Sequence, residues 1–165
     1  NVVIQTYDPD NYVIKSAKEQ DYEAFYAQEI EYRQMMHYPP VWNMLLIHIT
    51  SDDENAAAEA AEYVYTLASD IAGTISAGDC VKTDDAGTIK ADHKREHSTS
   101  RIQLIGPADA AISKVNDIYR KVIYIKTSQY ALLVQIKDGI ETVIKDNVKT
   151  KNVTVSFDFN PVSGF

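Results

Sequence analysis

The hydrophobic residues of the chain recur with strand spacing in four segments. The clearest is residues 153–159, where Val and Phe alternate with Thr, Ser and Asp, as in a strand with one buried face. Residues 41–50 are apolar on both faces, which predicts a central strand. Shorter strands are expected at residues 101–105, which Gly106–Pro107 closes, and at residues 119–126.

Three further segments have the spacing of amphipathic helices. The first runs from Lys18 to Met36 and ends before Pro39–Pro40, because proline cannot donate a backbone hydrogen bond. The second follows the capping-box pattern Ser51–Glu54 and ends at Gly73. The third is capped by Ser128, and its apolar stripe is Leu132, Ile136, Ile140, Val143 and Ile144.

From residue 41 onward the order of predicted elements is strand, helix, strand, strand, helix, strand. This order is that of the α+β, ferredoxin-like split βαβ fold, in which an antiparallel sheet carries both helices on one face. The opposite face is expected to stay open for a partner. Residues 74–100 have few apolar anchors and are expected to form a mobile loop.

Composition and cysteine content narrow the class of protein. The chain has 165 residues, 45% of them hydrophobic, and a formal net charge of −8. The longest aliphatic run, Met44–Ile47, is far shorter than a membrane span, and no basic start followed by an apolar stretch predicts a secretory leader. With Cys80 as the single cysteine, an internal disulfide is excluded, and we expect a soluble protein of the cytoplasm.

Charge is distributed unevenly along the chain. Residues 1–100 carry 7 basic and 18 acidic side chains, a net of −11, whereas residues 101–165 carry 9 and 6, a net of +3. The net positive charge of residues 101–165 is compatible with a surface that binds phosphates. The alternative is that a net charge of +3 over this length is ordinary surface variation.

Motifs for catalysis or for metal binding are missing. No phosphate-binding glycine loop occurs, and no catalytic residue can be assigned, so we expect no enzymatic activity. Cys80, His93 and His97 lack a fourth ligand and a helical setting, which favours a solvated loop over a metal site. No cofactor is expected for this chain.

A basic strand offers a better-supported candidate site. On residues 119–126, Arg120, Tyr124 and Lys126 share one face, where cations can neutralise phosphates and the ring can stack on a base. The alternative is a strand whose basic side chains extend to solvent at a sheet edge.

Motifs in the same order along nearly the whole chain resemble the C-terminal region of the primosomal replication-restart helicase (PriA, primosomal protein N′) family. They are Val3–Tyr7 with Pro9 and Tyr12, Asp21–Tyr26, Glu29 with Arg33, Tyr38–Pro40, Ile105–Pro107 with Ala110, Ile112 and Lys114, Tyr119–Arg120 with Lys126, and Asp158–Pro161 with Ser163.

The resemblance implies an ATP-dependent 3′–5′ DNA helicase of superfamily 2 that restarts stalled forks. Residues 1–20 then resemble the tail of the second helicase lobe. Within them, the apolar β-branched run Val2–Ile4, followed by a cluster of turn residues, is expected to be the last strand of a domain whose remainder is missing. Residues 21–165 resemble the C-terminal domain, whose fold is similar to that of a small-subunit ribosomal protein. The ATP-binding and zinc-binding regions of the family lie upstream.

The implied partners are forked or single-stranded DNA, single-stranded DNA-binding protein, primosome-loading proteins and the upstream helicase lobes. The predicted DNA-binding residues are Lys114, Arg120, Tyr124 and Lys126. Gln129 stands where the family often has a basic residue, which leaves open the contact with single-stranded DNA-binding protein. Two alternatives are a scaffold that packs on the helicase lobes without touching DNA, and a free-standing ferredoxin-like enzyme or sensor.

Overall fold

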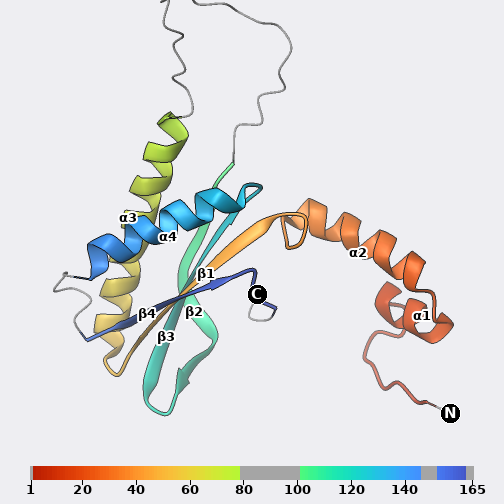
Figure 1. Cartoon of the computed structure of the whole chain (residues 1–165). Helices are drawn as coiled ribbons and strands as arrows, with labels where there is room; N and C mark the ends of the chain where they lie inside the picture. Colours follow the sequence, from red (N-terminus) through yellow and green to blue (C-terminus); the bar gives the residue numbers. More distant parts are fainter. Residues whose placement is uncertain (1, 79–100, 146–151, 163–165) are drawn as a thin grey trace, which may run out of the picture.

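An antiparallel sheet with two helices on one face forms the body of the protein, and two further helices precede it (Figure 1). The computed structural model describes residues 2–78, 101–145 and 152–162. The helices are α1 (Tyr12–Glu19), α2 (Tyr22–Met36), α3 (Glu54–Gly78) and α4 (Tyr130–Ile144). The strands are β1 (Asn43–Ser51), β2 (Gln103–Val115), β3 (Ile118–Thr127) and β4 (Thr154–Phe159).

The strand order in the sheet is β2-β3-β1-β4, with every neighbouring pair antiparallel. This arrangement confirms the predicted α+β, ferredoxin-like fold. β1 is central, as its two apolar faces indicated, and it pairs with β3 from Asn43 to Ser51 and with β4 from Leu45 to Thr50.

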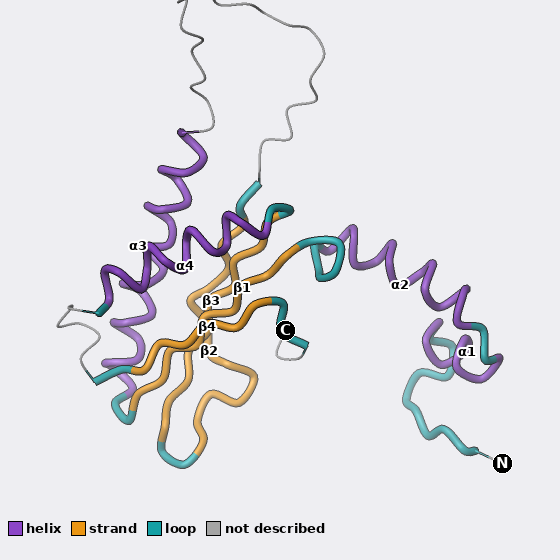
Figure 2. Tube along the Cα trace, viewed as in Figure 1, coloured by secondary structure: helices purple, strands orange, loops and turns teal. Residues whose placement is uncertain are grey.

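The hydrophobic core lies between the sheet and the helices α3 and α4. Alternate residues of β1 and β3 point into it, and they are fully buried: Leu45, Ile47, Ile49, Ile123 and Ile125. α3 contributes mainly alanines, so its backbone lies close to the sheet, whereas α4 contributes Leu133, Ile136 and Ile140. Figure 2 shows the two helices on the same side of the strands.

Helix ends depart from the predicted positions in two places. α3 continues through Gly73 to Gly78, so the first five residues of the predicted 74–100 loop are helical. Residues 79–100, including Cys80, His93 and His97, lie outside the described residues. Gln129, not Ser128, is the N-cap position of α4, and its side chain makes no capping hydrogen bond.

β2 continues past the position where the sequence predicted its end. The strand runs through Gly106–Pro107 to Val115, and its pairing with β3 shifts between Ile105 and Ala108. The prediction was wrong because β2 is an edge strand, where a proline at a bulge removes no hydrogen bond that the sheet needs.

The N-terminal segment differs most from prediction. Residues 2–4 form no strand, because no described strand offers them a partner. The predicted helix 18–36 is two helices, separated at Gln20, which adopts a left-handed φ of 57°, and at Asp21, whose carboxylate caps α2. α1 and α2 pack against each other and extend away from the sheet (Figure 1).

Replacing Gly106 or Gly73 with alanine should change the stability of the chain in opposite directions. Gly106 has a φ of 115°, and a Cβ there would lie 2.9 Å from the carbonyl oxygen of Val122, so Gly106→Ala should lower the free energy of unfolding by about 1–3 kcal/mol. Gly73 lies exposed in α3 with open space around it, so Gly73→Ala should raise that free energy by about 0.5–1 kcal/mol. Urea denaturation measures both, and equal signs would contradict this account.

Candidate nucleic-acid interface

The four predicted DNA-binding residues lie on two different faces of the sheet. Arg120, Tyr124 and Lys126 occupy alternate positions of β3 and share the face opposite the helices. Lys114 of β2 is the cross-strand partner of Tyr119, which points to the helix side of β3. Since cross-strand partners point the same way, Lys114 cannot act on the same surface as Arg120.

Lys126 is buried, with 7% of its surface exposed. Its ammonium group lies 4.0 Å from the centroid of the Tyr38 ring, and it donates a hydrogen bond to the carbonyl oxygen of Met36 at 3.3 Å. Burial lowers the pKa of Lys126 below its ordinary value, because the charged ammonium loses water contacts, and none of the described carboxylates forms an ion pair with it. In this position Lys126 has little surface to offer a phosphate.

The segment that covers Lys126 is the connector, residues 37–42, between α2 and β1. Its His37 ring stacks on Trp42 at 3.8 Å between centroids and lies 3.3 Å from the side-chain oxygen of Gln103. Arg33 of α2 donates to the carbonyl oxygen of Pro39 at 2.6 Å. The connector therefore joins α2 to one end of the sheet face that was expected to be open, and that expectation is corrected for this end.

Tyr124 is half-buried at the edge of the covered part. Burial raises the pKa of its hydroxyl, and the nearby Tyr38 adds to the effect. Its cross-strand neighbours are Leu46, which is buried, and Ile105 of β2. Only part of the Tyr124 ring is thus available for stacking.

The remaining part of this face, which we call the polar end, lies away from the connector. It consists of His48, Thr50, Arg120, Thr154 and Ser156, which are cross-strand or next-but-one neighbours on β1, β3 and β4. Beside it is a polar cavity of about 530 Å³, lined by Thr50, Ser51, Asp52, Ile118, Asn152 and Thr154.

Arg120 differs from the other basic residues of β2 and β3. Lys114 pairs with Asp117 at 3.0 Å and lies over the Tyr119 ring, and Lys121 pairs with Asp109 at 2.6 Å. Within the described residues, the half-buried guanidinium of Arg120 makes no ion pair and no hydrogen bond. Its five N–H donors are free to bind an anion such as phosphate.

His48 lies next to Arg120 and is its electrostatic neighbour. Burial lowers the pKa of His48, the charge of Arg120 lowers it further, and Asp158 opposes both effects. The lowered pKa keeps the imidazole of His48 mainly neutral at pH 7, which leaves the guanidinium of Arg120 as the main positive charge of the polar end.

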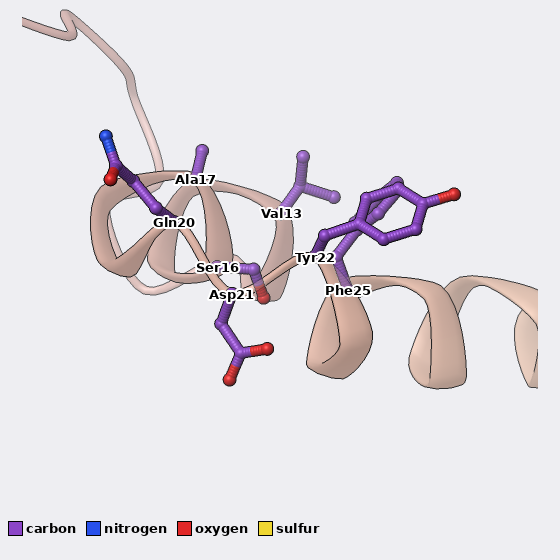
Figure 3. A pocket seen from close by; sticks show the side chains of 7 residues that line it. All are labelled: Val13, Ser16, Ala17, Gln20, Asp21, Tyr22 and Phe25. Carbon is purple, nitrogen blue, oxygen red and sulfur yellow. The ribbon is translucent and has the colours of Figure 1, made fainter.

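α1 and α2 form a second exposed surface, far from the polar end. α2 has no buried residue, and the exposed fractions of Tyr22 and Met35 are 70% and 69%. An apolar cavity of about 320 Å³ opens between the two helices, where Val13 lies beside Tyr22 and Phe25 (Figure 3).

The two helices are held together by specific contacts. The Tyr12 ring stacks on Phe25, and its hydroxyl donates to Glu29 at 2.5 Å, which raises the pKa of Tyr12 and lowers that of Glu29. Glu29 also binds Arg33, the ion pair that its helical spacing suggests. Sequence reasoning missed α1, although Asn11, which caps it, is a favoured first residue of a helix.

Within the described ranges, no helix is both long and apolar enough to cross a bilayer. In the same residues, no group of three or more His, Cys, Asp and Glu side chains is arranged to hold a metal ion.

Comparison with known proteins gives one family. The model of the family described as "Primosomal protein N C-terminal domain" matches residues 34–162. A Bacillus subtilis (strain 168) protein named "Replication restart protein PriA" is 29% identical over 161 residues, which is 98% of this chain and 17% of that protein. Proteins of the same name from Borreliella burgdorferi and Synechocystis are 24% and 23% identical over 98% of this chain, and 20% and 16% of their own lengths.

The pKa of His48 tests the geometry of the polar end. Arg120→Met removes a positive charge beside the ring and should raise the pKa of His48, measured by NMR titration of the imidazole protons. Lys137→Met on α4 is the matched control and should leave that pKa unchanged, because Lys137 is not among the charges acting on His48. An equal effect of both variants would contradict the described geometry.

Proposed function

Because the chain belongs to the primosomal protein N C-terminal domain family, we propose that it serves replication restart as a DNA- and partner-binding domain of a 3′–5′ DNA helicase. The chain spans only 16–20% of the length of each of these three relatives. ATP binding, zinc binding and helicase activity therefore belong to other parts of the proposed whole protein, and this chain hydrolyses no ATP.

The division of the chain follows from the same proposal. Residues 1–20 are the end of the second helicase lobe, and residues 21–165 are the C-terminal domain. α1 and α2 lie on either side of this boundary and pack on each other, which supports their role as the joint between the two parts. In the cytoplasm, single-stranded DNA-binding protein and primosome-loading proteins are the proposed protein partners.

The free guanidinium of Arg120 is the observation that carries the DNA-binding role. It lies on a rigid strand, beside hydroxyl groups and in the part of the chain that has a net charge of +3. Arginine binds phosphate through two parallel N–H donors, so one backbone phosphate of forked or single-stranded DNA fits there. A base that stacks on this surface would use the exposed part of Tyr124.

Lys114 and Lys126 are assigned different parts in this proposal. Lys114 is exposed at the β2–β3 hairpin, where exchanging Asp117 for a phosphate would give a second contact on the other side of the sheet. Lys126 contributes no phosphate contact. It stabilises the connector through its hydrogen bond to Met36 and its contact with the Tyr38 ring.

A second candidate function is a scaffold that packs on the helicase lobes without touching DNA. The exposed aromatic side chains of α2 and the apolar cavity between α1 and α2 favour it, since such surfaces mark protein interaction sites. The two functions use separate surfaces, so they can be tested separately.

Arg120→Glu should weaken binding of the chain to a forked DNA by about tenfold or more at low salt, because it removes a cation and adds repulsion. In a salt titration, the neutral variant Arg120→Met should reduce the slope of log affinity against log salt by about 0.7–0.9, the value for one phosphate contact. Fluorescence anisotropy measures both quantities.

Lys137→Met, which removes a cation from α4 on the other side of the sheet, is the matched control, with an expected slope equal to that of the unaltered chain. Circular dichroism confirms that each variant is folded. If Arg120→Glu and Arg120→Met bind the fork as the unaltered chain does, Arg120 is not the contact and the scaffold function is supported instead.

A further inference from the structure

The two edges of the sheet differ in how well they are protected against pairing with another strand. β2 carries Pro107 and two shifts in pairing, between Ile105 and Ala108 and between Asp109 and Lys114. Such irregularities are typical of protected edges. β4 has none of them: it pairs regularly with β1, it contains no Pro, Gly or Lys, and none of the described residues pairs with its outer side.

The backbone groups of β4 that face outward follow from its pairing. Asn160 donates its backbone N–H to the carbonyl oxygen of Met44 at 2.8 Å, immediately after the strand ends. Residues that face the partner strand alternate with residues that face away from it. The even-numbered residues of β4 therefore bond to β1, and Val155, Phe157 and Phe159 direct their N–H and C=O groups away from the sheet.

The side chains of the same three residues are only partly covered. Val155, Phe157 and Phe159 point to the helix side and pack against the core, yet all three are half-buried, unlike the fully buried residues of β1 and β3. Tyr130 of α4 lies 5.3 Å from Phe159 between ring centroids and is itself exposed. A further strand beside β4 would cover this apolar row.

On the other face, the outward side chains of β4 are polar and exposed. They are Thr154, Ser156 and Asp158, and Asp158 makes no ion pair with any described residue. Opposite charges on neighbouring strands stabilise their pairing, whereas like charges oppose it. A lysine or arginine is thus the residue that best suits the position beside Asp158.

We propose that the outer edge of β4 binds an extended peptide segment of a partner protein, which adds a fifth strand to the sheet. The segment has apolar residues at alternate positions, against Val155 and Phe157, and a basic residue beside Asp158. A second copy of this chain suits the edge less well, because each copy carries a net charge of −8 and repels the other. This edge adjoins the polar end, which also includes Thr154 and Ser156, and it is separate from the cavity between α1 and α2.

The probe is a synthetic peptide as long as β4, capped at both ends, with alternating valine and threonine and one lysine in place of the threonine beside Asp158. Its matched control has glutamate there. The unaltered chain should bind the lysine peptide roughly two- to tenfold tighter, and Asp158→Lys should reverse that order. Asp158→Lys should remain folded, since the side chain is exposed.

Hydrogen exchange followed by NMR locates the peptide. The backbone N–H groups of Val155, Phe157 and Phe159 should exchange rapidly in the free chain and slowly with the peptide, while those of Ser156 and Asp158 should be slow in both. Slow exchange of all five in the free chain would show a covered edge and overturn the proposal. Protection that rises with protein concentration, together with a dimeric mass, would also overturn it. The same holds if Asp158→Lys leaves the relative affinities of the two peptides unchanged.

Discussion

The buried ammonium group of Lys126 is the contact on which the arrangement of this protein depends. It reaches from the C-terminal end of the inner strand β3 to the Tyr38 ring and to the carbonyl oxygen of Met36. A desolvated cation over an aromatic ring contributes about 2 kcal/mol, and a buried cation without partners is costly, so the sheet and the connector hold each other in place. Because Met36 ends α2, the same contact sets where that helix leaves the sheet.

This contact divides the sheet face opposite the helices into two parts with different properties. Near the connector, Met44 and Leu46 are buried, as in a core. At the polar end, the guanidinium of Arg120 makes no ion pair or hydrogen bond with any described residue, and the lowered pKa of His48 keeps its ring mainly neutral at pH 7. Three surfaces are consequently available to partners: the polar end, the adjoining edge of β4, and, apart from both, the aromatic surface of α2.

Much of the fold could be predicted from periodicity alone. The alternation at residues 153–159 corresponds to β4, because successive side chains of a strand point to opposite faces of the sheet. The apolar run at residues 41–50 corresponds to β1, which is a central strand. Strand limits at Gly106 and helix limits at Gly73 were wrong, since the edge position of β2 and the packing of α3 override local preference.

The candidate site was less predictable. Periodicity correctly placed Arg120, Tyr124 and Lys126 on one face, but it carries no information on which segment covers that face. The burial of Lys126 depends on Tyr38, which lies 88 positions earlier in the sequence, and the separation of Lys114 depends on the pairing of β2 with β3. Such long-range contacts are visible only in the folded chain.

Chemical-shift mapping with a single-stranded oligonucleotide tests most directly the claim that DNA contacts the polar end while the connector stays in place. The account predicts shifts of the backbone signals of His48, Thr50 and Arg120, and unchanged signals for Tyr38 and Lys126. Shifts centred on Tyr38 and Lys126 would contradict it, because they would show that DNA displaces the connector and binds the part of the sheet that it covers.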